Sequence, residues 1–91
     1  MKYTLKPTSQ FKKDLKLMKK RGNDLTLLEE VLSLLADGKP LAEKYRNHTL
    51  TGDFVGCSEC HIKPDWLLIY EYDEEILYLY LLRTGSHSDL F

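Results

Sequence analysis

The side chains best suited to acid–base chemistry lie in the second half of this chain. Its three histidines are His48, His61 and His87, and Asp65 and Arg83 lie near two of them in the sequence. Phosphodiester cleavage needs one group that takes a proton from the nucleophile, one that protonates the leaving oxygen, and a cation that stabilises the developing charge. Imidazole, carboxylate and guanidinium groups supply these functions, so we treat these five residues as candidate catalytic residues.

The second half also predicts a sheet that would bring most of them together. Three runs of strand-like composition, separated by short polar connections, span 54–62, 66–72 and 76–83. Short connections predict an antiparallel meander, in which the end of the first strand, the start of the second and the end of the third meet at one end of the sheet. His61, Asp65 and Arg83 occupy these positions, and His87 follows directly.

The pattern also fits a structural interpretation, in which these are turn and surface residues of an ordinary meander. The density of histidines favours a site. His48 is less certain, because it precedes the first of these runs by six residues. The polar segment 38–53, which has no clear periodicity, would have to fold back across the sheet to bring it in.

The first half predicts a short strand at 2–6, ended by Pro7, and two helices. Thr8 or Ser9 can cap the first helix and Asp24 the second. The buried stripes are Phe11, Leu15 and Met18 in the first helix and Leu25, Leu28, Leu32 and Leu35 in the second. The expected fold is α+β in the order β-α-α-β-β-β, with two N-terminal helices on a mainly antiparallel four-stranded sheet, in one domain over residues 1–91.

Composition excludes several classes of protein. A chain of 91 residues with 43% hydrophobic and 30% charged residues should fold around one core. Its longest apolar run, 76–82, is seven residues and too short to span a bilayer. The first residues show no secretory signal, so we expect a cytoplasmic protein without a membrane partner.

The charge is distributed unevenly. Residues 1–46 hold eleven Lys or Arg against six Asp or Glu, whereas residues 47–91 hold two against eight. The basic face of the first helix is a candidate contact for RNA or the ribosome, although a solvated amphipathic face explains it equally well. Its members are Lys12, Lys13, Lys16, Lys19, Lys20 and Arg21. Trp66 and Phe91, near the proposed site, could stack on bases.

The segment Cys57-Ser-Glu-Cys60-His61 matches a haem-attachment pattern and half of a zinc site. On a strand, residues three apart point to opposite faces, so the two thiols could not converge on one metal or porphyrin. We therefore expect buried, inert cysteines and no metal or cofactor.

Taken together, three segments resemble the YafQ branch of the RelE/ParE superfamily, the toxins of bacterial type II toxin–antitoxin pairs. They are His48-Thr-Leu-Thr-Gly52, His61-Ile-Lys-Pro-Asp65-Trp66-Leu-Leu-Ile-Tyr70 and Arg83-Thr-Gly-Ser-His87-Ser-Asp-Leu-Phe91. The resemblance extends over nearly the whole chain and implies a RelE-like fold. It also implies a ribosome-dependent endoribonuclease that inhibits translation by cutting mRNA through attack of the 2′-OH on the adjacent phosphate.

The resemblance further implies roles for individual residues. His87 would be the general acid, His61 or Asp65 the general base, and Arg83 the group that stabilises the phosphorane, with His48 assisting. Trp66 and Phe91 would orient the base. Relatives often carry arginine where this chain has Ser58, and Lys63 is the candidate replacement for that phosphate contact.

The implied partners are a cognate antitoxin, the ribosome and mRNA, with DNA contacted only through the antitoxin. Two other functions stay open. A ParE-like toxin would poison gyrase on the same scaffold, but it does not need the histidines. A non-catalytic domain would bind RNA or a partner through the basic helix and leave no cyclic-phosphate ends.

Overall fold

The order of elements confirms the α+β fold and adds to it. The computed structural model describes all residues 1–91. Its elements are β1 (Thr4–Pro7), α1 (Ser9–Lys20), α2 (Leu25–Ala36), the short 3-10 helix η1 (Glu43–Tyr45), β2 (His48–Thr49), a second 3-10 helix η2 (Gly52–Phe54), β3 (Ser58–Lys63), β4 (Trp66–Asp73), β5 (Tyr78–Gly85) and α3 (His87–Leu90). No helix has the length and apolar character needed to cross a bilayer.

The two long helices begin at the residues expected to cap them. The Thr8 hydroxyl accepts a hydrogen bond from the Phe11 N–H, and the Asp24 carboxylate accepts one from the Thr26 N–H. These bonds satisfy backbone donors that the first turn leaves without partners. The helices therefore start where the sequence predicts.

The sheet has five strands in the order β1-β5-β4-β3-β2, which corrects the expected four. β1 pairs in parallel with β5, and the other pairs are antiparallel. The added strand, β2, has only two residues and lies in the segment expected to be a loop. Its strand character comes from pairing with β3, which periodicity does not reveal.

Two strands begin later than expected. The strand predicted over 54–62 starts at Ser58, because η2 and a turn through Gly56, whose φ is +89°, precede it. The strand predicted over 76–83 starts at Tyr78, since Leu77 adopts a left-handed φ of 56° in the turn. Left-handed backbone cannot continue a β ladder, so both runs lose their first residues.

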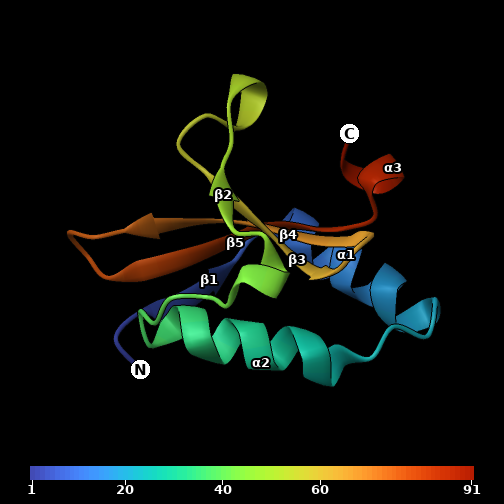
Figure 1. Cartoon of the computed structure of the whole chain (residues 1–91), viewed down its shortest axis with the longest axis horizontal. Helices are drawn as coiled ribbons and strands as arrows, with labels where there is room; N and C mark the ends of the chain where they lie inside the picture. The colour runs from blue at the N-terminus through green and yellow to red at the C-terminus, as the bar shows by residue number, and fades with distance from the viewer.

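Each face of the sheet is buried by different elements. Trp66, Leu68 and Tyr70 of β4 join the main core under α1 and α2, whereas Leu67 and Ile69 join a smaller cluster with Leu90 of α3. Figure 1 shows α2 on one side of the sheet and α3, with the η2 loop, on the other. The nearly continuous apolar sequence of β4 therefore reflects burial on both faces.

The two cysteines lie on opposite faces, as expected. Cys60 is in the main core and Cys57 in the smaller cluster, and both thiols are free and buried. Burial raises the pKa of the Cys60 thiol to about 12. A thiol with such a pKa stays protonated and unreactive at neutral pH.

Candidate active site

The hairpin of β2 and β3 builds one half of the site. His48 is paired with Glu59, and His61 lies two residues further along β3 on the same face as Glu59. One carboxylate oxygen of Glu59 lies 3.5 Å from Nε2 of His48 and 3.4 Å from Nε2 of His61. Glu59 is only 5% exposed. The pairing therefore places one buried carboxylate behind two imidazoles.

Backbone carbonyls fix the orientation of both rings. Nδ1 of His48 lies 2.8 Å from the carbonyl oxygen of Arg46, and Nδ1 of His61 lies 3.3 Å from that of Pro64. A carbonyl oxygen only accepts, so each Nδ1 is the donor. This leaves Nε2 of each ring directed at Glu59.

The second half of the site joins the start of α3 to the β3–β4 turn. One carboxylate oxygen of Asp65 accepts hydrogen bonds from the backbone N–H of His87 at 2.9 Å and from its Nδ1 at 2.6 Å. These bonds, the backbone one first, lower the pKa of Asp65 below its ordinary value. Nε2 of His87 makes no hydrogen bond, so it is free to exchange a proton with a substrate.

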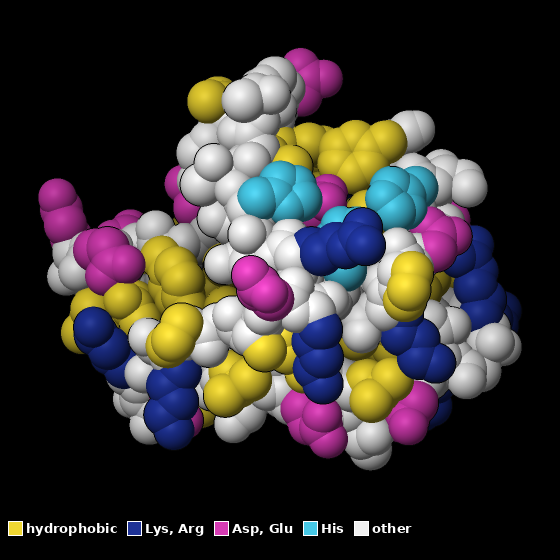
Figure 2. Space-filling view, viewed as in Figure 1, with side chains coloured by type: hydrophobic (Ala, Val, Ile, Leu, Met, Phe, Trp, Pro, Cys, Tyr) yellow, Lys and Arg dark blue, Asp and Glu magenta, His cyan; other side chains and the backbone are white.

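The two halves lie side by side on the sheet face that carries α3. The ring centroids of His61 and His87 are 5.7 Å apart, and those of His48 and His61 are 6.3 Å apart. Figure 2 shows the His side chains gathered on one face with a Lys or Arg side chain among them. The sheet predicted from the sequence does not include His48. In the structure, His48 reaches the cluster because β2 pairs with β3.

Arg83, at the end of β5, forms an ion pair with Asp14 of α1. Its Nε and Nη2 donate to the carboxylate of Asp14 at 2.7 and 3.2 Å, and the Thr84 N–H donates to the same carboxylate. Burial alone would raise the pKa of Asp14, but bonds from Arg83, Gln10 and Thr84 together lower it. None of the Arg83 nitrogens hydrogen-bonds to a histidine. Asp14 occupies the otherwise apolar face of α1 for this reason.

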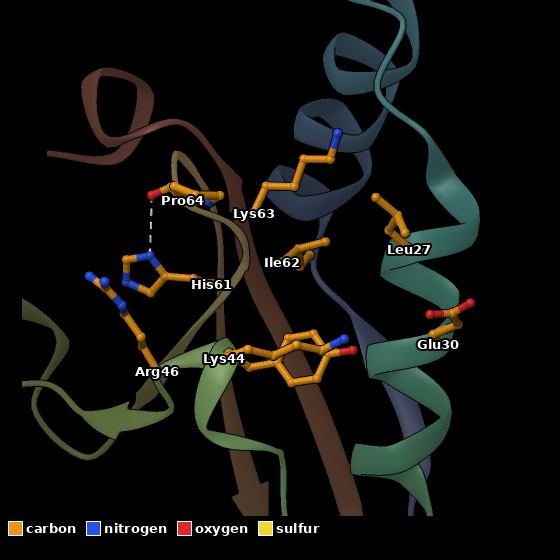
Figure 3. Close-up of a pocket in the computed structure, with 9 residues that line it drawn as sticks. Leu27, Glu30, Lys44, Arg46, His61, Ile62, Lys63 and Pro64 are labelled. Carbon is orange, nitrogen blue, oxygen red and sulfur yellow. Dashed lines mark hydrogen bonds between the residues drawn. The ribbon is translucent and has the colours of Figure 1, made fainter.

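A cleft opens beside His61, at the edge of β3 that β2 leaves uncovered. It has a volume of about 440 Å³. Figure 3 shows Arg46 beside the His61 ring and Lys63 at the end of β3, at the same cleft. Arg46 therefore supplies a cation near the His61 imidazole.

The two predicted stacking residues have different environments. Trp66 is only 2% exposed, and its Nε1–H donates to the Thr84 hydroxyl at 2.9 Å. It is a core residue, which corrects its expected place at the surface of the site. Phe91 is 64% exposed and packs edge-to-face on Phe54, with ring centroids 5.8 Å apart.

The basic residues of α1 divide into two groups. The five lysines of the predicted basic face are exposed, namely Lys12, Lys13, Lys16, Lys19 and Lys20. Arg21, in contrast, donates two hydrogen bonds, of 2.6 and 3.0 Å, to the carboxylate of Asp89 in α3. The lysine face thus stays available to a partner while Arg21 joins α1 to α3.

Sequence reasoning missed three residues of this region: Glu59, Arg46 and Asp14. Each has a weak signal in the sequence. Glu59 lies two positions before His61, the spacing that puts two residues on one face of a strand. Asp14 interrupts the apolar stripe of α1 beside Leu15. No group of three or more His, Cys, Asp or Glu side chains is arranged to hold a metal ion.

Comparison with known proteins identifies relatives of this chain. The chain matches, over residues 3–91, the family described as bacterial toxin of type II toxin-antitoxin system, YafQ. It is 38% identical over 85 residues to the mRNA interferase toxin YafQ of Escherichia coli K12, an alignment that covers 92% of this chain and 90% of that protein.

Solved structures show the same fold. A metal-bound toxin from Helicobacter pylori is 46% identical with a TM-score of 0.92, covering 98% of this chain and 99% of that one. The E. coli DinJ-YafQ complex gives 36% identity and a TM-score of 0.89, covering 98% of both chains. The chain therefore belongs to the YafQ family of bacterial type II toxin–antitoxin toxins.

Proposed function

We propose that this chain is an mRNA interferase, a ribosome-dependent endoribonuclease that stops translation by cutting message. The observation that carries the proposal is the pairing of two imidazole–carboxylate units on one face, with His61 and His87 5.7 Å apart. Such a pair can take one proton and deliver another across a single phosphodiester. Membership of a family with an mRNA interferase at 38% identity supports the same function.

His61 is the better of the two candidate bases. Asp65 already accepts two bonds from His87, and its lowered pKa makes it a weaker base. Glu59 lies behind His61 and His48 and stabilises the imidazolium that forms when a ring takes the proton of the 2′-OH. His48 assists through this shared carboxylate.

His87 is the general acid. Asp65 holds its Nδ1–H and leaves Nε2 facing outward, so a protonated ring can deliver the Nε2 proton to the departing 5′-oxygen. The 2′-oxygen then bonds to phosphorus as the bond to the 5′-oxygen breaks. The products are a 2′,3′-cyclic phosphate and a 5′-hydroxyl end. Arg83, which also lies within the electrostatic influence of Asp89 in α3, is the candidate cation for the phosphorane oxygens.

Primer extension on mRNA from cells that express the wild type or the His87→Ala variant tests the proposal. A general acid contributes about 10²- to 10⁴-fold, so His87→Ala should nearly abolish cleavage and leave ribosome binding intact. Ser88→Ala, on the same short helix, is the matched control. Cleavage that survives in His87→Ala would refute the assignment, and wild-type protein without cyclic-phosphate ends would indicate a binding domain.

The proposed partners follow from the exposed surfaces. The lysine face of α1 suits ribosomal RNA, because neutralising phosphates releases counterions and strengthens binding at low salt. A ribosome-dependent enzyme works in the cytoplasm. The E. coli DinJ-YafQ complex suggests a cognate antitoxin for this chain. In the complex, the antitoxin and not this chain would contact DNA. Co-expression with the antitoxin should yield a co-purifying complex, and failure to co-purify would count against the pairing.

A further inference from the structure

The cleft beside His61 has no role in the proton transfers described above. It is walled by α2, the η1 segment and the end of β3 (Figure 3). Its volume of about 440 Å³ lies within the range of small-ligand sites. Its lining combines an apolar floor, which includes Leu27 and Ile62, with three cations, Lys44, Arg46 and Lys63.

None of these three cations forms an ion pair with a carboxylate, although Lys63 is close enough to Asp24 to help lower the pKa of that carboxyl. The molecule has five ion pairs, and none of them includes Lys44, Arg46 or Lys63. Lys44 lies 5.0 Å over the ring of Tyr45, which also lines the cleft. Glu30 is the one carboxylate of the lining. Unpaired cations around a cleft with an apolar floor and an aromatic ring suit a group that carries both phosphate and a planar base.

The backbone at Arg46 is strained in a way that serves the cleft. Arg46 has a φ of 46°, which is uncommon for a residue other than glycine. In this conformation its carbonyl accepts the bond that orients His48, while its side chain lies beside His61. Strain of this kind persists where surrounding contacts hold it, and it concentrates at functional sites.

We propose that the cleft binds the nucleotide next to the scissile linkage of the RNA. Arg46 and Lys63 would hold the flanking phosphate, and Lys44 would add to the positive electrostatic potential of the cleft. Tyr45 and the apolar floor would pack against the base or ribose. Because His61 belongs both to the cleft and to the catalytic face, a strand cut at His61 and His87 has this flanking pocket beside it. The proposal rests on the proposed nuclease function.

A binding titration tests it directly. The probe is a fluorescent pool of mixed-sequence RNA tetranucleotides with a 2′-deoxy sugar at the second position, so that the central linkage cannot be cut. Each lost phosphate contact should reduce the slope of log K against log salt by about 0.7. We expect this reduction for Arg46→Ala and for Lys63→Ala. Lys39→Ala, an exposed lysine outside the cleft and without an ion pair, should keep the wild-type slope.

A chemical change in the RNA provides the second arm. Two further probes carry a neutral methylphosphonate, one on each side of the central linkage. If Arg46 holds one of these phosphates, the probe that is neutral at that position should bind the wild type as weakly as the unmodified probe binds Arg46→Ala. The same neutral probe should bind Arg46→Ala no more weakly than the unmodified probe does. Wild-type affinity and slope in Arg46→Ala and Lys63→Ala would overturn the proposal. Loss of antitoxin binding without loss of RNA binding would also overturn it and would assign the cleft to a peptide.

Cleavage on programmed ribosomes separates this proposal from the function on which it rests. If the nuclease function fails, the wild type itself leaves no cyclic-phosphate ends. If only the cleft proposal fails, the wild type cuts message and Arg46→Ala and Lys63→Ala cut it with the same kcat/KM. If both hold, the cleft variants lose kcat/KM through a raised KM, whereas His87→Ala loses kcat.

Discussion

At the scale of the residue, the site depends on what each ring nitrogen faces. His48 and His61 donate Nδ1–H to backbone carbonyls and direct Nε2 at the buried Glu59, whereas His87 donates Nδ1–H to Asp65 and keeps Nε2 free. The same side-chain type therefore has two environments. One suits a group that gains a proton, and the other suits a group that loses one.

The environments of Trp66 and Phe91 lead to a testable contrast. Trp66→Phe removes a buried hydrogen bond to Thr84 and should lower the free energy of unfolding by about 1–3 kcal/mol, while RNA affinity stays unchanged. Phe91→Ala should keep the fold and lose about 1–3 kcal/mol of RNA binding, because an exposed ring that stacks on a base is removed. Urea denaturation and RNA titration of both variants measure the two effects. The reverse result would place Trp66 in the RNA interface.

Sequence reasoning located the candidate acid–base residues better than the groups that support them. His61, Asp65 and His87 follow from turn positions, which a meander brings together without knowledge of side-chain packing. Glu59 and Asp14 were missed, because their importance lies in being buried and paired across elements. Trp66 was misplaced for a related reason: alternation along β4 turns it toward the helices, and the first residue of a strand gives no indication of which face that is.

At the scale of the element, α3 is held by few contacts, and Arg21 provides one of them. The ion pair with Asp89 ties the helix that begins at His87 to the end of α1. Arg21→Ala and Asp89→Asn should each speed amide hydrogen exchange in α3 and lower the cleavage rate. Combined, they should cost no more than Asp89→Asn alone, because the Asp89 carboxylate accepts both the Arg21 bonds and the Ser86 N–H bond that caps α3.

Lys20→Ala is the matched control for this tether, since Lys20 is exposed beside Arg21 and forms no ion pair. Its α3 amides should exchange at the wild-type rate. Strictly additive losses in the double variant, or an effect of Arg21→Ala alone, would show that Arg21 acts on RNA and not on α3.

The bond network between α1 and β5 predicts a pH dependence of stability. The pKa of Asp14 is lower in the folded chain than the value of about 3.9 for an unfolded one. The carboxylate therefore stabilises the fold above that pH, and this contribution is lost as pH falls through the folded pKa. Asp14→Asn should cost about 1–3 kcal/mol near pH 7 and progressively less as the pH falls below about 4.

Urea denaturation of the wild type and Asp14→Asn over this pH range measures the difference. Glu29→Gln, an exposed carboxylate of α2 without an ion pair, is the matched control and should follow the wild type. A difference between the wild type and Asp14→Asn that stays constant with pH would contradict a role for the ionised carboxylate.

The elements predicted well are those with their own periodic pattern and caps. α1, α2, β1 and the meander of β3, β4 and β5 follow from sequence, apart from strand ends that turn geometry shifts. β2 and α3 could not be predicted, because two and four residues carry no period. β2 exists through its partner strand, and α3 depends on its capping box and on Arg21.

At the scale of the whole molecule, the basic half presents α1 and the acidic half carries most of the sheet. We expect the triple variant Lys12→Gln, Lys16→Gln and Lys19→Gln to associate more slowly with ribosomes at low salt. Its fold should be unaffected because these lysines are exposed. The difference should shrink toward about 1 M salt, where the screening length falls to about 3 Å. Stopped-flow association at several salt concentrations measures it.

The charge-matched control is Lys2→Gln, Lys6→Gln and Lys39→Gln, which changes the net charge equally outside α1. If the basic face is the contact, the control should associate faster than the α1 variant at every low salt concentration. Equal slowing of both triple variants would attribute the effect to net charge alone.

The division of β4 between two faces has a consequence for how this protein can fail. Alternate residues of this strand belong to the main core and to the face that carries the candidate site, so a shift of β4 by a single residue against β3 would exchange the two sets. Such a misaligned chain would expose Leu68 and Tyr70 and could not fill the space under α1 and α2. The register that aligns the candidate site residues is therefore also the register that fills the hydrophobic core. A toxin with β4 out of register would lose its core packing and unfold.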